Sequence, residues 1–317
     1  MPSWQARVFS KVLRILVKRK PRMSLEKAVL LTRKKLNPPK FLRPPLAKGV
    51  MVTAVEQPGL KGEWVETIEG KSETVVYYLH GGAYVACSPA THRVFTSAIA
   101  LRSKARVFAL DYRLAPENRF PAAVEDSVAG YQWLLGQGIK AGDIIIGGDS
   151  AGGGLTLATL IALRDRGIEL PRAAFCLSPW TDLAGTGKSL VTNDKSDSMF
   201  YGSGIEKAAT VYLGDTRPDN PLASPLYGDL TGLPPLLIYA SRSEVLLDDS
   251  VRLVERARQF GVKADLRLGD GLPHVWPVFI GFKIPESLKA VEEIVEFIKT
   301  KTADQIIPNK ILTAINQ

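Results

Sequence analysis

Short apolar runs alternate with longer stretches of helical character from residue 74 onward, and this alternation constrains the fold more than any other feature of the chain. The apolar runs predict strands over residues 74–79, 106–110, 143–147, 173–177, 236–240 and 263–268. The longer stretches predict helices over residues 91–103, 121–136, 152–166, 246–260 and 285–299. Strands that are apolar on both faces are typical of a parallel sheet with helices packed on each side. The sequence therefore predicts an α/β fold.

Two further strands precede this alternation, over residues 50–56 and 63–68. They are more polar and closely spaced, so we expect an antiparallel pair at one edge of a mostly parallel, eight-stranded sheet. The last strand, residues 263–268, is expected to be exposed, where it is free to pair with a second copy in a homodimer.

Two segments fall outside the predicted sheet. Residues 1–45 indicate two helices and a loop. Residues 184–230 contain no strand-like run, and their stretch Ile205–Leu213 indicates a helix. We interpret both as parts of a helical cap. The main domain is then formed by residues 46–183 and 231–317.

Composition places the chain among ordinary globular proteins. It has 317 residues, of which 45% are hydrophobic and 23% charged, enough to bury a large core. The two cysteines, Cys87 and Cys176, do not make a disulfide framework, which favours a reducing compartment and a cytoplasmic location. With three histidines and no C-x-x-C or H-E-x-x-H pattern, we expect no metal site.

The positive charge of the chain is concentrated at its N-terminus. Residues 1–48 hold 14 Lys and Arg and one acidic residue, whereas the remainder of the chain is slightly acidic. A helix is indicated there, with Trp4, Val8, Val12, Ile15 and Leu16 on one side and basic residues on the other. We expect the apolar side to pack on the domain. Membrane contact through residues 1–20 is the alternative, and no nucleic-acid recognition motif is present.

A candidate nucleophile follows the strand at 143–147. Ser150 lies in Gly148-Asp149-Ser150-Ala151-Gly152, between that strand and a predicted helix. Such a turn strains the backbone of the serine, and small neighbours let the chain fold back closely. Packing or phosphate binding would also explain an isolated glycine-rich turn, so its meaning depends on partners elsewhere in the chain.

Candidate partners occur in the right kind of loop. His274 follows the last strand, and Glu244 and Asp248 follow the strand at 236–240. Loops at the carboxyl ends of parallel strands meet at one edge of the sheet, so a histidine and an acid can approach Ser150 there. We expect His92 to be a capping or surface residue.

A glycine-bent loop supplies candidate donors for a developing oxyanion. His80-Gly81-Gly82 ends the strand at 74–79, and we expect the N–H groups of Gly81, Gly82 and Ala151 to point at the reacting oxygen. His80 is then expected to hold the loop rather than to react.

Together these residues resemble the hormone-sensitive-lipase-like esterases, also called bacterial family IV. From about residue 50 the resemblance covers nearly the whole chain, and it includes His80-Gly81-Gly82-Ala83-Tyr84, Gly148–Gly153, Asp111–Glu117, Ser178–Leu183 and Pro273–Trp276. It implies an α/β-hydrolase fold with a cap built from the N-terminal helices and the later insertion. It also implies a serine carboxylesterase that acts on short- to medium-chain esters without a cofactor.

The resemblance also implies roles for individual residues. Ser150, Glu244 and His274 match the nucleophile, acid and base in the family's chain order, and Asp248 matches a second acidic position that we expect to support the histidine loop. Many relatives have a third glycine where Ala83 stands. Cys87 replaces another glycine and is expected to be an inert thiol.

Three aromatic residues are predicted to wall the substrate pocket: Tyr84, Trp180 and Trp276. Core packing is an equally good explanation for each of them. Two other functions remain as alternatives. One is a non-catalytic small-molecule receptor of the same fold, although such receptors usually lack a triad member. The other is a lipase or lipid amidase docked on a membrane through the basic N-terminal helix.

Overall fold

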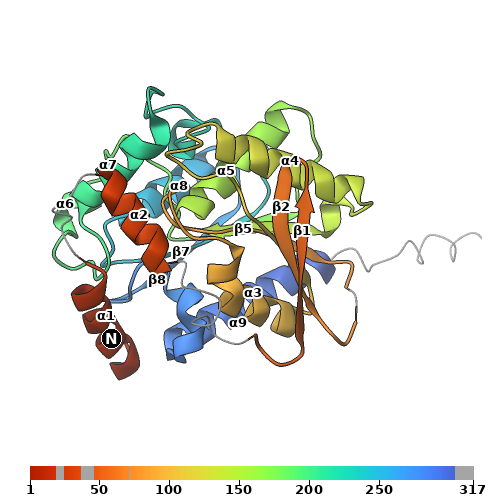
Figure 1. Cartoon of the computed structure of the whole chain (residues 1–317), viewed down its shortest axis with the longest axis horizontal. Helices are drawn as coiled ribbons and strands as arrows, with labels where there is room; N and C mark the ends of the chain where they lie inside the picture. The colour runs from red at the N-terminus through yellow and green to blue at the C-terminus, as the bar shows by residue number, and fades with distance from the viewer. Residues whose placement is uncertain (19–24, 37–45, 71, 304–317) are drawn as a thin grey trace, which may run out of the picture.

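The computed structural model describes residues 1–18, 25–36, 46–70 and 72–303, and it is built around one eight-stranded sheet (Figure 1). The strands are β1 (Val50–Gln57), β2 (Leu60–Thr67), β3 (Val75–Leu79), β4 (Arg106–Leu110), β5 (Ile144–Asp149), β6 (Ala173–Leu177), β7 (Leu236–Ser241) and β8 (Ala264–Gly269). Their order across the sheet is β1-β2-β4-β3-β5-β6-β7-β8. β2 pairs antiparallel with both β1 and β4, and all pairs from β4 to β8 are parallel.

Helices cover both faces of the sheet. The helices of the main body are α3 (Pro89–Ser103), α4 (Ala122–Gly136), α5 (Ala151–Asp165), α8 (Leu247–Gln259) and α9 (Pro285–Ala303). The outlying helices are α1 (Trp4–Leu16), α2 (Leu25–Leu36), α6 (Ser189–Thr192) and α7 (Gly202–Leu213), and short 3-10 turns lie at Ala141–Asp143, Pro225–Tyr227 and Trp276–Phe282.

Alternate residues of the central strands pack into two separate hydrophobic cores, one on each face of the sheet. In β5, Ile144 and Ile146 join the core under α4, α5 and α8, whereas Ile145 joins the core under α3 and α9. All three side chains are fully buried. Because successive side chains of a strand point to opposite faces, an uninterrupted apolar run is what a strand buried on both sides requires. The predicted α/β architecture is confirmed, with strand ends within a few residues of the expected positions.

The predicted edges of the sheet are also confirmed. β1 and β2 form the antiparallel edge, and among the strands that the structure describes β8 pairs only with β7. Within the described residues, no helix is both long enough and apolar enough to cross a membrane.

The expected packing of α1 is wrong. Its apolar stripe faces outward: Trp4, Val8, Val12, Ile15 and Leu16 are 42–68% exposed. The helix instead contacts the body through Ala6, which is fully buried, and through Phe9, whose ring packs against Phe279 and Phe282. The pattern indicated an amphipathic helix correctly, but it did not indicate which side the body would cover.

The two segments assigned to a cap make contacts close to the carboxyl ends of the strands. Arg33 of α2 donates to the carbonyls of Val85 and Ala115 and pairs with Glu117. Tyr212 of α7 stacks on Tyr84 with ring centroids 3.8 Å apart. The division of the chain at residue 45 lies outside the described residues.

The double-sided burial of β5 makes its interior sensitive to truncation. We expect Ile146→Ala to lower the free energy of unfolding by about 2–5 kcal/mol, because it removes buried methyl groups and leaves a cavity. Ile68→Ala is the matched control, since Ile68 is 70% exposed and its truncation should cost less than about 0.5 kcal/mol. Urea unfolding of both variants measures the difference, and equal losses would contradict the assigned core.

Candidate active site

Ser150 lies at a sharp turn between β5 and α5, with φ 52° and ψ −120°. Few non-glycine residues adopt such angles, and they persist only where the surroundings hold them. Here the Ser150 N–H donates to the Leu177 carbonyl at 2.8 Å, and the Ser150 carbonyl accepts from the Trp180 N–H at 2.9 Å. The neighbouring strand β6 and the loop that follows it therefore hold the strained residue at both its N–H and its carbonyl.

The glycines around Ser150 allow the close approach that this turn needs. A Cβ on Gly152 would lie 2.0 Å from the Leu79 carbonyl oxygen, and one on Gly148 would lie 2.4 Å from the Gly152 carbonyl oxygen. Both obstacles are backbone atoms and have no flexible end to move aside. The small residues of the pentapeptide are thus required by the packing of α5 against β3.

His274 and Glu244 are brought together from the loops after β8 and β7. The Nδ1 atom of His274 lies 3.0 Å from Glu244 Oε2, and both side chains are almost fully buried. Since Nδ1 faces a carboxylate, it carries the proton and donates it. Nε2 is buried and has no hydrogen-bond partner among the described residues. It is therefore the ring nitrogen with a free lone pair.

Ser178 joins the acid to the histidine loop, and sequence reasoning did not assign it this role. Its hydroxyl donates to Glu244 Oε2 at 2.8 Å and accepts from the Val275 N–H at 3.0 Å. Ser178 directly follows β6 and is fully buried. Its sequence signal was present in the Ser178–Leu183 motif, but only the structure shows what the hydroxyl contacts.

The surroundings of His274 favour its charged form. Burial is the largest single influence and lowers its pKa, but the hydrogen bond and charge of Glu244, with Asp197 and Asp149, together raise the pKa above its ordinary value. The ring is also covered by Phe200, which meets it edge-on with centroids 5.2 Å apart. The imidazole is held in place from the side of the insertion.

Asp197 positions that cover and was also missed at the sequence level. Its Oδ1 accepts from the N–H groups of Met199 and Phe200, and its Oδ2 accepts from the N–H of Val245, next to the acid. Asp197 is 1% exposed. One buried carboxylate thus ties the segment over His274 to the loop that carries Glu244.

Gly81 is not the oxyanion donor that the sequence suggested. Its N–H donates to Asp149 Oδ1 at 2.9 Å and is therefore already engaged. By contrast, no acceptor among the described residues binds the N–H groups of Gly82, Ala83 or Ala151. Ala151 opens α5, where the first N–H groups have no partner within the helix. Gly82 and Ala83 both have positive φ, 119° and 55°.

Asp149 lies at the centre of a buried polar cluster behind the glycine loop. Besides Gly81, its carboxylate accepts from the Tyr78 hydroxyl at 2.6 Å and lies 3.2 Å from His92 Nε2. His92 is 6% exposed, so the expectation of a capping or surface residue is wrong. Burial lowers the pKa of His92, but the charge and hydrogen bond of Asp149 outweigh it and leave the pKa raised.

His80 has the structural role expected of it. Its Nδ1 lies 2.7 Å from the Gly81 carbonyl, and its ring stacks on Tyr112 with centroids 4.3 Å apart. Burial is the largest influence on the ring and lowers its pKa to about 3, so the imidazole is neutral. Cys87 is a free thiol whose pKa is raised to about 12 by burial, which agrees with the inert side chain predicted.

Asp248 does not support the histidine loop, contrary to expectation. Its carboxylate accepts from the Ser189 N–H at 3.0 Å, at the start of α6. The next residue, Asp249, is buried and accepts from the N–H groups of Thr181 and Asp182. Both acids of this pair therefore organise the insertion and the loop after β6 rather than His274.

The three predicted pocket aromatics separate into two groups. Trp276 belongs to the core under α3 and α9 and packs against Tyr239, on the other face of the sheet from α5, so it is not a pocket wall. Tyr84 and Trp180 lie in the core on the α5 side, with centroids 6.2 Å apart. Both belong to segments next to Ser150, because Tyr84 follows the glycine loop and the Trp180 N–H contacts the Ser150 carbonyl.

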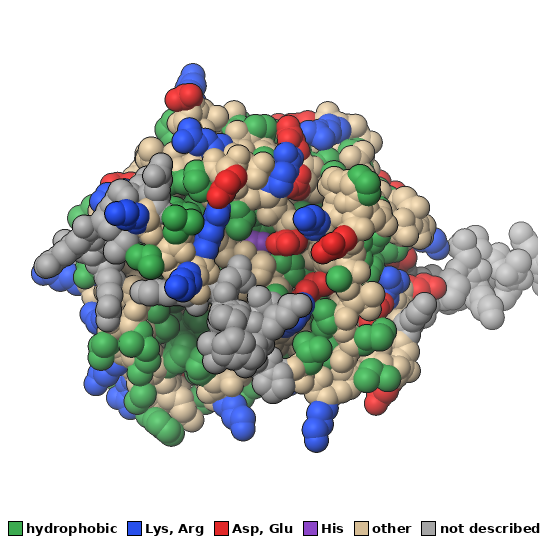
Figure 2. All heavy atoms as spheres, in the orientation of Figure 1, with side chains coloured by type: hydrophobic (Ala, Val, Ile, Leu, Met, Phe, Trp, Pro, Cys, Tyr) green, Lys and Arg blue, Asp and Glu red, His purple; other side chains and the backbone are tan. Residues whose placement is uncertain are grey.

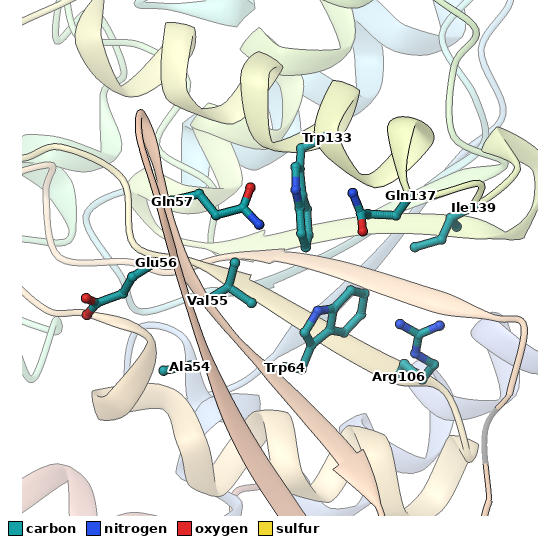
Figure 3. A pocket seen from close by; sticks show the side chains of 9 residues that line it. All are labelled: Ala54, Val55, Glu56, Gln57, Trp64, Arg106, Trp133, Gln137 and Ile139. Atoms are coloured by element: carbon teal, nitrogen blue, oxygen red, sulfur yellow. The ribbon is translucent and has the colours of Figure 1, made fainter.

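A groove lies elsewhere, at the antiparallel edge of the sheet (Figure 3). It has a volume of about 430 Å³ and is lined by residues of β1, by Trp64 and Arg106, and by Trp133, Gln137 and Ile139 at the end of α4 and just beyond it. None of the predicted site residues lines it. Among the described residues, no group of three or more His, Cys, Asp or Glu side chains is placed to hold a metal ion.

Comparison with known proteins gives one matching family model. Residues 76–278 match the family described as having the alpha/beta hydrolase fold. The matched region spans the sheet from β3 to β8 and includes Ser150, Glu244 and His274.

Individual relatives are similar over most of the chain. An acetyl-hydrolase of Streptomyces hygroscopicus is 44% identical over 76% of this chain and 80% of its own length. An esterase of Acinetobacter venetianus is 36% identical over 86% of this chain and 93% of its own length. The crystal structure of an esterase from the bacterial hormone-sensitive lipase family superposes with a TM-score of 0.86 at 41% identity, covering 95% of this chain and 99% of that one.

The buried Asp149–His92 pair generates a prediction on stability. Asp149→Ala should lower the free energy of unfolding by about 3–5 kcal/mol, because it leaves a buried imidazole, a phenol and an N–H without their acceptor. The pKa of His92 is raised, so the contribution of the pair to the free energy of unfolding is lost as pH rises through the pKa of His92 in the folded protein. Burial raises the pKa of Asp149, but His92 and Tyr78 have the larger combined effect and leave the pKa below its ordinary value. The contribution of the pair is therefore also lost as pH falls through the pKa of Asp149.

The cost of Asp149→Ala should therefore be greatest between about pH 4 and 6.5. Denaturant unfolding at several pH values measures it. Asp165→Ala is the control, because Asp165 makes an ion pair with Arg164 that is largely exposed on the Asp165 side and should cost less than about 1 kcal/mol. A flat pH dependence would contradict the buried pair.

Proposed function

The chain belongs to the hormone-sensitive-lipase-like branch of the alpha/beta hydrolase fold family and is a carboxylic ester hydrolase, and we propose that Ser150, His274 and Glu244 are its catalytic triad. The observation that carries the proposal is the convergence of three strand ends. The turn after β5 exposes a strained serine, and the loops after β7 and β8 bring an acid and an imidazole into contact.

Acylation begins at Ser150. Its hydroxyl oxygen attacks the ester carbonyl carbon while the Nε2 atom of His274 takes the hydroxyl proton. His274 then gives that proton to the alcohol oxygen as its bond to the carbonyl carbon breaks. The alcohol leaves and the acyl group remains on Ser150. Water activated in the same way by His274 releases the carboxylic acid and restores the serine.

The oxyanion is held by backbone N–H groups. We assign this role to Gly82, Ala83 and Ala151, because the N–H of Gly81 is occupied by Asp149. Each donor aimed at the oxyanion supplies about 3–4 kcal/mol of transition-state stabilisation. Alanine in place of a third glycine keeps this function, since only the N–H is needed.

Glu244 orients the imidazole and stabilises the imidazolium that forms during each proton transfer. The hydrogen bond from the His274 Nδ1–H fixes the tautomer in which Nε2 is the base. Ser178 supports this arrangement as a positioning residue, because it holds the carboxylate and the histidine loop at once.

The cap limits the substrate to short- and medium-chain esters in this proposal. Phe200 of residues 184–230 covers His274, and Tyr212 of the same segment stacks on Tyr84. α2 is anchored by Arg33 beside the glycine loop. Tyr84 and Trp180 remain the predicted pocket walls, whereas Trp276 does not.

Two further expectations stay predictions. The free edge of β8 supports a homodimer formed through that strand. The two free cysteines, Cys87 and Cys176, fit a reducing, cytoplasmic compartment.

The triad is tested first at its nucleophile. Ser150→Ala should lower kcat for a p-nitrophenyl acyl ester by about 10³-fold or more, because no acyl-enzyme can form. Its circular dichroism spectrum and unfolding curve should match those of the unchanged protein. Ser103→Ala, at the end of α3, is the control and should keep full activity. Activity within tenfold of the unchanged protein would refute Ser150 as the nucleophile.

The acid is tested by its effect on pH dependence. Glu244 raises the pKa of His274, so kcat/KM of the unchanged protein should fall as pH drops through a value above about 6.5. Glu244→Gln should move this acid limb to lower pH and reduce the plateau by about 10³–10⁴-fold. Asp248→Asn is the matched control and should change neither. A larger loss from Asp248→Asn would transfer the role to that residue.

A further inference from the structure

α1 presents a continuous apolar stripe to the outside of the molecule. Trp4 is 65% exposed, Val8 51% and Ile15 68%, although each is large and hydrophobic. Single exposed apolar residues are common on protein surfaces, but a contiguous patch marks an interaction site. Figure 2 shows hydrophobic side chains gathered at the lower left of this face, where Figure 1 places α1, with lysine and arginine side chains beside them.

The exposed stripe adjoins the side of α1 that packs on the body but extends well beyond it. At about 100° per residue, the exposed apolar side chains of α1 from Trp4 to Leu16 fall within an arc of about 120°. The packed residues Phe9 and Ala6 lie next to one side of this arc, about 20° and 80° beyond Leu16. One side of the apolar surface of α1 is therefore covered by the body, and the wider, exposed part has no partner among the described residues.

Basic residues border the exposed stripe. Arg7 and Lys11 are exposed and lie beside Trp4 on the helix, and residues 1–25 contain seven Lys and Arg and no acidic residue. A second copy of this chain would bring the same positive charges face to face, which opposes a symmetric dimer through α1. An apolar stripe with basic residues along its border and a tryptophan at its end is typical of a helix that binds the headgroup region of an anionic lipid layer.

Arg14 of the helix and Lys18, just after its end, fix the orientation of α1 on the body. Arg14 donates to the carbonyls of Lys195 and Ser196, and Lys18 donates to the carbonyls of Asp194 and Asp197. Ser3 at the other end donates to Glu286 of α9. Both ends of α1 are thus fastened, so its outer face is presented by a rigid support. The fastening at Asp197 also places that face beside the segment that covers His274.

We propose that α1 docks this protein on an anionic lipid surface, with Trp4, Val8 and Ile15 inserted at the headgroup boundary and Arg7 and Lys11 against the lipid phosphates. Docking in this way holds the cap over the strand ends next to the lipid. The proposal concerns binding alone and does not depend on the catalytic residues assigned above.

The test is flotation of the full chain with lipid vesicles, using the Ser150→Ala variant so that no lipid is hydrolysed. Vesicles of phosphatidylglycerol and phosphatidylcholine in equal parts should bind the protein, and pure phosphatidylcholine should bind it much less. Arg7→Glu with Lys11→Glu should weaken binding by about 25-fold or more, because each basic residue near an anionic surface contributes about fivefold. The control pair Lys140→Glu and Lys263→Glu has the same charge change and should weaken binding by less than about threefold.

The apolar contribution is tested separately. Trp4→Ser with Ile15→Ser should weaken binding by at least about tenfold, whereas Met51→Ser with Ile68→Ser, an equally exposed pair elsewhere, should leave it unchanged. Without the Ser150→Ala change, both pairs should retain hydrolysis of a soluble p-nitrophenyl ester, which shows that they fold. Failure of the Ser150→Ala protein to float with anionic vesicles would overturn the proposal. So would a dimer in sedimentation that Trp4→Ser with Ile15→Ser converts to monomer.

Discussion

The turn at Ser150 depends on the two backbone hydrogen bonds that β6 and the residues after it make to that residue. They hold a non-glycine residue at φ 52°, a conformation that the isolated segment would leave at once. Everything else at the site is arranged around this fixed point. β6 continues into Ser178, which bonds both Glu244 and the loop of His274, so β6 and the residues directly after it support all three residues of the proposed triad.

Buried carboxylates provide most of the remaining organisation, and each one acts through hydrogen bonds rather than exposed ion pairs. Asp149 holds the glycine loop, Asp197 holds the cover of His274, and Asp249 holds the loop after β6. A buried carboxylate with several donors is costly to disrupt, because its partners lose their acceptor in a place that water does not reach. The residues behind Ser150 and His274 are therefore held in place by buried hydrogen bonds.

Sequence patterns predicted much of this molecule, for identifiable reasons. The isoleucine run of β5 predicted a strand buried on both faces, and the glycines flanking Ser150 predicted a tight turn, since both are local requirements of the backbone. Gly81 and His92 were misjudged because their roles depend on Asp149, which meets them only after the chain has folded. The outward face of α1 was misjudged for a related reason: an amphipathic pattern identifies an apolar side but does not say what covers it.

The sequence by itself determined the α/β class and the succession of strands along the chain, and it placed the proposed triad of Ser150, Glu244 and His274 just after three of the predicted strands. These follow from periodicity and from short motifs, which are properties of neighbouring residues. Only the tertiary structure decided which N–H groups stay free beside Ser150, which acid meets His274, and which surface of α1 is left open. Those outcomes depend on contacts between residues tens to hundreds of positions apart, and such contacts exist only once the sheet has assembled.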